Sequence, residues 1–138
     1  MRKIGGFYMK AINNSAARTM RKMIGMMEDG YAKIRKSSSF MPVTIEHVGQ
    51  NSLGQLFSVA HYCEQNGDLM RDPEVVFILG RDEEFYPITI QQDYIGKYEE
   101  ALEYDATGKI RGWYPRLQAD FASFANFWLK NIKDQQNL

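Results

Sequence analysis

The spacing of apolar residues changes along this chain from a helical period to a period of two, and then back again. Near the N-terminus apolar residues recur at intervals of three and four, at Ala16, Met20, Met23, Ile24 and Met27. From Met41 they alternate with polar residues, and after Pro115 the helical spacing returns at Leu117, Phe121, Phe124, Trp128 and Ile132. The two periods are those of helices and strands. The sequence therefore predicts an α+β fold, in which an antiparallel sheet of four to five strands is flanked by an N-terminal and a C-terminal helix.

The boundaries of these elements follow from turn and cap residues. Ser15 is predicted to cap the first helix and Asp29-Gly30 to stop it, with 33–39 continuing it and fraying into a polar linker. Pro115 is predicted to begin the last helix, which extends to about residue 134. The predicted strands span 41–48, 56–63, 75–79 and 86–91, and 97–104 is predicted as a fifth although its composition also suits a helix.

Length and composition favour one domain. The chain has 138 residues, 44% of them hydrophobic and 25% charged, which is typical of a globular domain with a single core. We divide it into a basic helix and linker at 1–39, a sheet at 40–112 and a helix at 113–138. No apolar run is long enough to span a membrane, no secretory signal is apparent, and Cys63 stands alone. These features predict a cytoplasmic protein.

Charge is distributed unevenly along the sequence. Residues 1–36 contain nine lysines and arginines but two acidic residues, a net charge of +7, whereas the whole chain is neutral. This imbalance predicts a non-enzymatic protein that binds a macromolecule, either nucleic acid or protein, through Arg18, Arg21, Lys22, Lys33, Arg35 and Lys36. A homo-oligomer held by the two oppositely charged parts is an alternative, and a purely solvated helix face is the plainest interpretation.

Acidic residues gather between the second and third predicted strands, in a segment expected to be a loop over 64–74. Asp68, Asp72 and Glu74, with His61 nearby, are candidate catalytic residues of a metal-dependent hydrolase or nuclease, because Mg²⁺ prefers oxygen ligands. The lysine that many sheet-edge nucleases place two residues after the second acid is missing, since Val76 occupies that position. Turn formation by Asn66-Gly67 and Asp72-Pro73 explains the same composition without any chemistry.

Histidine and cysteine offer a third kind of site. His61 and Cys63 would share one face of a strand, with His47 on a neighbouring strand, but their spacing matches no established zinc pattern. A nucleophilic pair of Cys63 and His61 lacks any identifiable oxyanion donor or orienting group. Gly5-Gly6 lacks the strand and helix that flank a phosphate-binding loop. We therefore expect no metal and no cofactor.

Three stretches of the sequence resemble a known family. They are HYCEQNGDLMRDPEVVF at 61–77, YPITIQQD at 86–93 and GKYEE at 96–100. They are similar to an uncharacterised bacterial family found on plasmids, integrated conjugative elements and phages, and the similarity covers roughly residues 40–104. The resemblance implies a cytoplasmic accessory role in the upkeep of a mobile element or in its conflict with host defences. It implies no activity and no catalytic residues, so the central motif is either a binding site or a structural signature.

Overall fold

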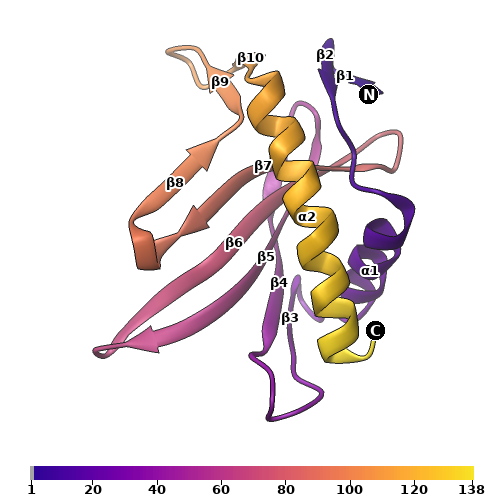
Figure 1. The fold of residues 1–138 in the computed structure, drawn as a ribbon. Coiled ribbons are helices and arrows are strands. Elements are labelled where there is room, and N and C mark those ends of the chain that lie inside the picture. Colours follow the sequence, from indigo (N-terminus) through magenta and orange to yellow (C-terminus); the bar gives the residue numbers. More distant parts are fainter. Residues whose placement is uncertain (1) are drawn as a thin grey trace.

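The computed structural model describes residues 2–138, over which the chain forms two α-helices and a six-stranded antiparallel sheet (Figure 1). We call this the main sheet, and its strand order is β3-β4-β5-β6-β7-β8. Its strands are β3 (Tyr31–Ile34), β4 (Val43–Asn51), β5 (Gly54–Gln65), β6 (Asp68–Gly80), β7 (Phe85–Gln92) and β8 (Lys97–Glu100). Two small hairpins accompany it, β1 (Arg2–Ile4) with β2 (Phe7–Met9) and β9 (Leu102–Tyr104) with β10 (Ile110–Trp113). The α+β prediction is confirmed, with more strands than the predicted four to five.

The N-terminal helix α1 (Asn14–Gly25) is shorter than predicted. Its cap is Asn13, whose side-chain oxygen accepts a hydrogen bond from the amide of Ala16, so the prediction of Ser15 as the cap was wrong. The buried side chains of Met20 and Met23 anchor the helix, as their spacing predicted.

The predicted helical continuation at 33–39 was also wrong. After α1 the chain turns at Asp29 and Gly30, which both have positive φ, and returns as edge strand β3. In β3 the side chains of Ala32 and Ile34 are more buried than those of Tyr31 and Lys33, so this segment has the period of a strand.

The predicted loop between the second and third strands is instead the outer end of a long hairpin. Strands β5 and β6 stay paired up to Gln65 and Asp68, and only Asn66 and Gly67 form the turn, both with positive φ. The tight turn at Asn66-Gly67 is thereby confirmed. The paired ends were missed because their side chains are exposed on both faces, so they lack an apolar alternation.

The predicted fifth strand is divided into two strands in the structure. A 3-10 turn η1 (Asp93–Ile95) leads into β8, and the predicted strand at 97–104 is broken at Ala101. Its first half joins the main sheet as β8, whereas its second half pairs with β10 as β9.

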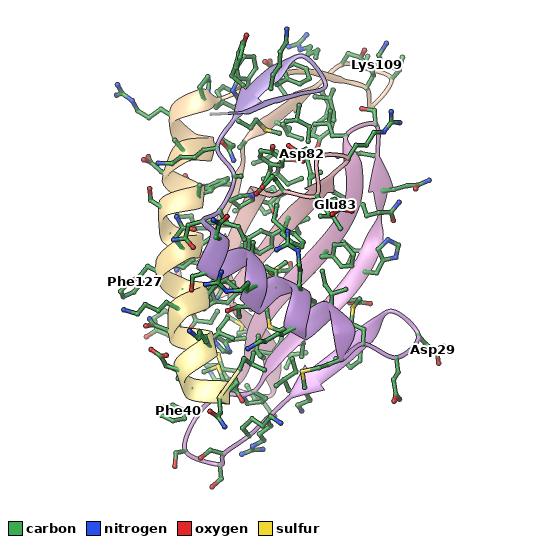
Figure 2. All side chains as sticks on the ribbon, turned by 90° about the vertical axis from the view of Figure 1, so that its right-hand side faces the viewer. Asp29, Phe40, Asp82, Glu83, Lys109 and Phe127 are labelled. Atoms are coloured by element: carbon green, nitrogen blue, oxygen red, sulfur yellow. The ribbon has the colours of Figure 1, made fainter. Side chains whose placement is uncertain are left out.

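The helices cover one face of the main sheet (Figures 1 and 2). Helix α2 (Pro115–Gln136) has Pro115 in its first turn, as predicted, and buries Phe121, Trp128 and Ile132 against the sheet. No helix within residues 2–138 is long and apolar enough to cross a membrane.

Two glutamines on α2 bind the backbone of distant segments. The side chain of Gln118 accepts a hydrogen bond from the amide of Lys10 (2.7 Å) and donates to its carbonyl oxygen (2.9 Å). Gln136 in the same way accepts from the amide of Lys36 (3.0 Å) and donates to the carbonyl oxygen of Met41 (3.0 Å). Both glutamines are fully buried, and their amide groups are hydrogen-bonded. Gln118 thereby attaches the first half of α2 to the segment before α1, and Gln136 attaches the end of α2 to the connection between β3 and β4.

The opposite face of the main sheet is only partly covered. The hairpins β1–β2 and β9–β10 pack on one end of it, in a second apolar cluster that includes Ile78, Tyr86 and Leu102. The ring of Phe7 lies edge-on to that of Trp113, with centroids 5.2 Å apart, and joins the two hairpins. Toward the other end of this face Val76 still packs against the second cluster, whereas Glu46, Glu74 and Gln91 are partly or fully exposed.

Candidate functional site

The four candidate catalytic residues do not come together. Asp68 is exposed at the hairpin tip, and Glu74 accepts a hydrogen bond from the Ser58 hydroxyl (2.6 Å). His61 lies on the helix-covered face, where its ring packs edge-on against Trp128 at 5.6 Å. Since Glu74 pairs with Ala60, the residue next to His61, Glu74 and His61 point to opposite faces of the sheet.

The remaining acid of the set, Asp72, lies in the irregular part of the hairpin. It precedes Pro73 through a cis peptide bond, in the segment where the register between β5 and β6 shifts. Within residues 2–138 no group of three or more histidine, cysteine, aspartate and glutamate side chains is arranged to hold a metal ion.

The two histidines are separated in the same way. His61 contacts the carbonyl oxygen of Pro42 through Nδ1 (3.0 Å), and His47 contacts Gln55 through Nε2 (2.6 Å). In the register of β4 and β5, His61 lies opposite Val43, four residues from His47. That offset corresponds to about 13 Å, too far for a shared metal ion.

Part of the predicted basic set surrounds one open hollow. We call Arg18, Arg21, Lys22 and Lys36 the basic surface; the last three line a hollow of about 430 Å³ between the end of α1 and the end of α2, together with Gly25, Met26, Asn137 and Leu138. Arg18 is exposed on α1, four residues before Lys22 and so on the same side of the helix.

The other two basic candidates lie elsewhere. Lys33 is exposed on the face opposite the helices, because its neighbours Ala32 and Ile34 are the residues that face α1 and α2. Arg35 is exposed immediately after β3. The six residues therefore do not form one continuous patch.

Arg21 also has a structural contact. Its guanidinium donates a hydrogen bond to the carbonyl oxygen of Glu83 (2.9 Å) and lies over the ring of Phe85, 5.7 Å from its centroid. It joins α1 to the turn between β6 and β7, so its guanidinium helps to stabilise the fold and is not wholly available to a ligand.

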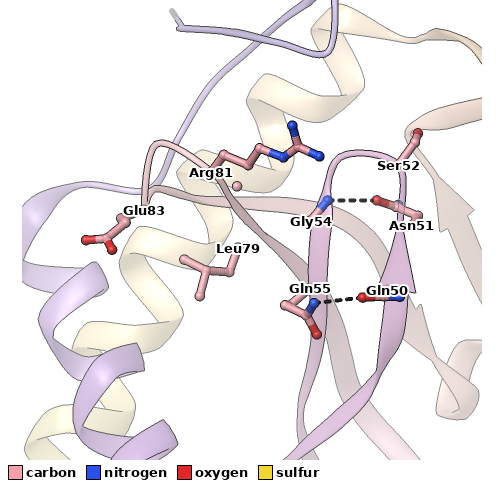
Figure 3. Close-up of a pocket in the computed structure, with 9 residues that line it drawn as sticks. Gln50, Asn51, Ser52, Gly54, Gln55, Leu79, Arg81 and Glu83 are labelled. Carbon is pink, nitrogen blue, oxygen red and sulfur yellow. Dashed lines mark hydrogen bonds between the residues drawn. The ribbon is translucent and has the colours of Figure 1, made fainter.

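A second hollow lies where the β4–β5 and β6–β7 turns meet (Figure 3). It encloses about 350 Å³ and is lined mainly by polar residues. Most of its polar groups bond to one another: the Asn51 side chain accepts from the amide of Gly54 (3.2 Å), and Gln55 donates to Gln50 (2.9 Å). Arg81 and Glu83 bring opposite charges to its rim, so this hollow selects no particular ligand.

The uncovered end of the sheet is the feature that sequence reasoning missed. Two rows of paired residues cross all six strands there, and we call them the open face; it is exposed toward its edges, whereas Ser58, Ala60 and Thr89 at its centre are buried. One row is Lys33, Thr44, Ala60, Glu74, Gln91 and Tyr98, and the other is Tyr31, Glu46, Ser58, Val76, Thr89 and Glu100. The alternation of tyrosine and glutamate at 98–100 is the only local signal of this face, because the rest depends on strand register.

An ion pair borders the open face. The Asp93 carboxylate accepts hydrogen bonds from the amide of Arg71 (2.9 Å) and from its Nε (2.8 Å), and these bonds lower the pKa of Asp93. Arg71 is opposite Tyr62 in the hairpin and lies 3.9 Å from Glu74. Burial, followed by the charge of Glu74, raises the pKa of the Tyr62 hydroxyl.

Comparison with known proteins identifies a family without assigning an activity. No curated protein and no solved structure matches the chain. A family model described as a domain of unknown function (DUF6908) matches residues 14–138, which include both α-helices and the whole main sheet. The chain therefore belongs to the DUF6908 family.

Proposed function

We propose that the protein is a non-enzymatic accessory protein of a bacterial mobile element, and that it binds nucleic acid in the cytoplasm through the basic surface. The observation that carries this proposal is the convergence of Arg21, Lys22 and Lys36 on one open hollow, from two segments of the chain. Positive side chains that converge on an open surface suit the closely spaced phosphates of a nucleic acid. The mobile-element setting rests on the resemblance at 61–77.

The surface offers shape as well as charge. The hollow is open rather than enclosed, so a phosphate backbone can reach it without rearrangement of α1 or α2. A Cβ added at Gly25, one of its lining residues, would point into open space, so this part of the hollow leaves room for a ligand. These features favour contact with a backbone over recognition of base edges.

A metal-dependent hydrolase gains no support from the geometry. Glu74 and His61 lie on opposite faces of the sheet, and Asp68 is at the exposed tip of the hairpin. The acidic segment instead contributes to hairpin pairing and to the Ser58–Glu74 hydrogen bond.

The test is the salt dependence of binding to a random-sequence DNA duplex. We expect Lys22→Gln/Lys36→Gln to weaken binding at low salt and to reduce the slope of log K against log salt by about 1.8, since each phosphate contact contributes about 0.9. The matched control is Lys33→Gln/Lys109→Gln, which removes the same charge from the open face and from the exposed β9–β10 turn. Absence of binding by the unmodified protein at low salt, or equal loss in both variants, would contradict the proposal.

A further inference from the structure

The open face differs from the rest of the main sheet in being bordered by tyrosines. Tyr31 lies on edge strand β3 and Tyr98 on edge strand β8, with 46% and 59% of their surface exposed. Between them the side chains of Ala60 and Ser58 on the central strands are buried, with 0% and 4% of their surface exposed, and Thr44 is half-buried. The two tyrosines are thus separated by the width of the sheet, about 24 Å, and a partner would contact the exposed side chains toward the edges rather than the small residues at the centre.

Carboxylates alternate with these tyrosines. Tyr31 is opposite Glu46 in the register of β3 and β4, and Tyr98 is two residues from Glu100 on β8. Burial, followed by the charges of Glu100 and Glu74, raises the pKa of the Tyr98 hydroxyl. In the register of the sheet, Glu74 is separated from Tyr98 by Gln91 alone.

The face and its border have an excess of negative charge. Glu46, Glu74, Glu100 and Asp93 contribute four carboxylates, against two cations, Lys33 and Arg71. Burial raises the pKa of Glu100, and its carboxylate accepts a hydrogen bond from Tyr104, so Glu46 and Glu74 are the acids best placed to meet a partner. Arg71 is already neutralised by Asp93 at 2.8 Å. Exposed aromatic rings on a sheet can also stack with nucleic-acid bases, but carboxylates on the same surface repel phosphates, so the charge favours a basic polypeptide.

Arg71 itself shows what the face can bind. Its guanidinium is held by one carboxylate at 2.8 Å, has a second at 3.9 Å, and belongs to the residue paired with Tyr62. Glu46 is likewise paired with a tyrosine, Tyr31, across β3 and β4, whereas the Glu100 carboxylate accepts a hydrogen bond from the Tyr104 hydroxyl (2.9 Å). Planar guanidinium groups pair with carboxylates and stack on aromatic rings better than ammonium groups do.

We propose that the open face is a docking surface for an arginine-bearing segment of a partner protein, with Glu46 and Glu74 pairing with its guanidinium groups and Tyr31 and Tyr98 stacking on them. This surface is on the opposite side of the main sheet from α1, so it is independent of the basic surface proposed for nucleic acid (Figures 1 and 2). Within residues 2–138 the hydroxyls of Tyr62 and Tyr98 form no hydrogen bond, which leaves both available to the partner.

The experiment is calorimetric titration of the full chain with a synthetic peptide of alternating arginine and serine. We expect Glu46→Gln/Glu74→Gln to weaken binding about tenfold, and Tyr98→Ala to weaken it about threefold. Glutamine at position 74 keeps an acceptor for the Ser58 hydroxyl, so the fold is preserved. The matched control is Asp120→Asn/Asp134→Asn, which removes two exposed charges from α2 on the other side of the molecule and should change affinity less than twofold.

Several results would overturn the proposal. The first is absence of peptide binding at millimolar concentration, and the second is equal weakening in the test and control variants, which would indicate unspecific attraction. A lysine peptide that binds as tightly would remove the guanidinium assignment. Tight binding of single-stranded RNA that is lost in Tyr98→Ala would assign the face to nucleic acid. Self-association of the unmodified protein in ultracentrifugation, lost in Glu46→Gln/Glu74→Gln, would assign it to a second copy of the chain.

Discussion

The two faces of the main sheet use the same strands for opposite purposes. On the helix-covered face Val75, Phe77 and Ile90 are buried beneath α1 and α2 in one apolar cluster. On the open face the neighbouring residues Glu74 and Gln91 are hydrogen-bonded or partly exposed. Burial of apolar area accounts for most folding free energy, whereas exposed ion pairs contribute little. The difference indicates that the helix-covered face provides most of the stability. Substitutions of exposed residues on the open face should therefore cost little stability, even where they affect binding.

The largest expected effect is on the helix-covered face. Phe77 is fully buried in the apolar cluster, so Phe77→Ala removes buried area and leaves a cavity. We expect the free energy of unfolding to fall by about 3–5 kcal/mol, measured by urea denaturation. Phe77→Leu, which keeps most of the volume, serves as the control and should cost much less. A loss below about 1 kcal/mol for the alanine variant would show that this face is not the source of stability.

A smaller effect is expected where α2 binds the N-terminal segment. Gln118→Leu keeps the volume of the side chain but removes the bonds to the amide and carbonyl groups of Lys10. Because buried backbone groups without partners are costly, we expect a loss of about 1–3 kcal/mol in urea denaturation. Gln118→Glu keeps the acceptor for the amide but places a carboxylate in a fully buried site that faces two carbonyl oxygens, so we expect it to cost more than the leucine variant. Equal stability of the leucine variant and the unmodified protein would mean that water replaces the glutamine.

At the border of the open face we expect a pH-dependent effect. The folded pKa of Asp93 lies below its ordinary value because of hydrogen bonds from the backbone and side chain of Arg71. The ionised carboxylate therefore stabilises the fold above pH of about 4, and this contribution is lost as the pH falls through the folded pKa.

Asp93→Asn removes that contribution. We expect it to lower the free energy of unfolding by about 1 kcal/mol at neutral pH, since Arg71 is partly exposed. The difference between the variant and the unmodified protein should shrink below pH of about 4 in urea denaturation series. A difference that stays constant over the series would assign the effect to packing and not to charge.

The contrast between the faces also explains what the sequence could predict. The position of α2 followed from Pro115 and from the apolar spacing of Phe121, Trp128 and Ile132, since buried residues leave a periodic pattern. The turn at Asn66-Gly67 followed from local backbone preferences. Both features depend on residues that are close together in the sequence.

The candidate site depended on pairing between distant residues, and local patterns could not reveal it. Tyr31 and Glu100 belong to the same row only because six strands pair in one register. Strand β3 was mistaken for helix because Lys33 and its basic neighbours hide a short alternation of two buried residues. The linear charge imbalance likewise predicted one basic surface, whereas Lys33 lies on the open face.

The smallest expected effect on stability is at Tyr98, and it is the sharpest test of the contrast. Its side chain is 59% exposed on an edge strand, so Tyr98→Ala should change the free energy of unfolding by less than about 0.5 kcal/mol in the denaturation assay used for Phe77→Ala. Phe77 and Tyr98 are both aromatic residues of the main sheet, and burial is the main difference between them. If Tyr98→Ala cost more than about 2 kcal/mol, this edge of the open face would have a structural role, and weaker peptide binding by the variant would reflect unfolding. A neutral effect on stability combined with weaker binding of the arginine peptide would assign Tyr98 to recognition.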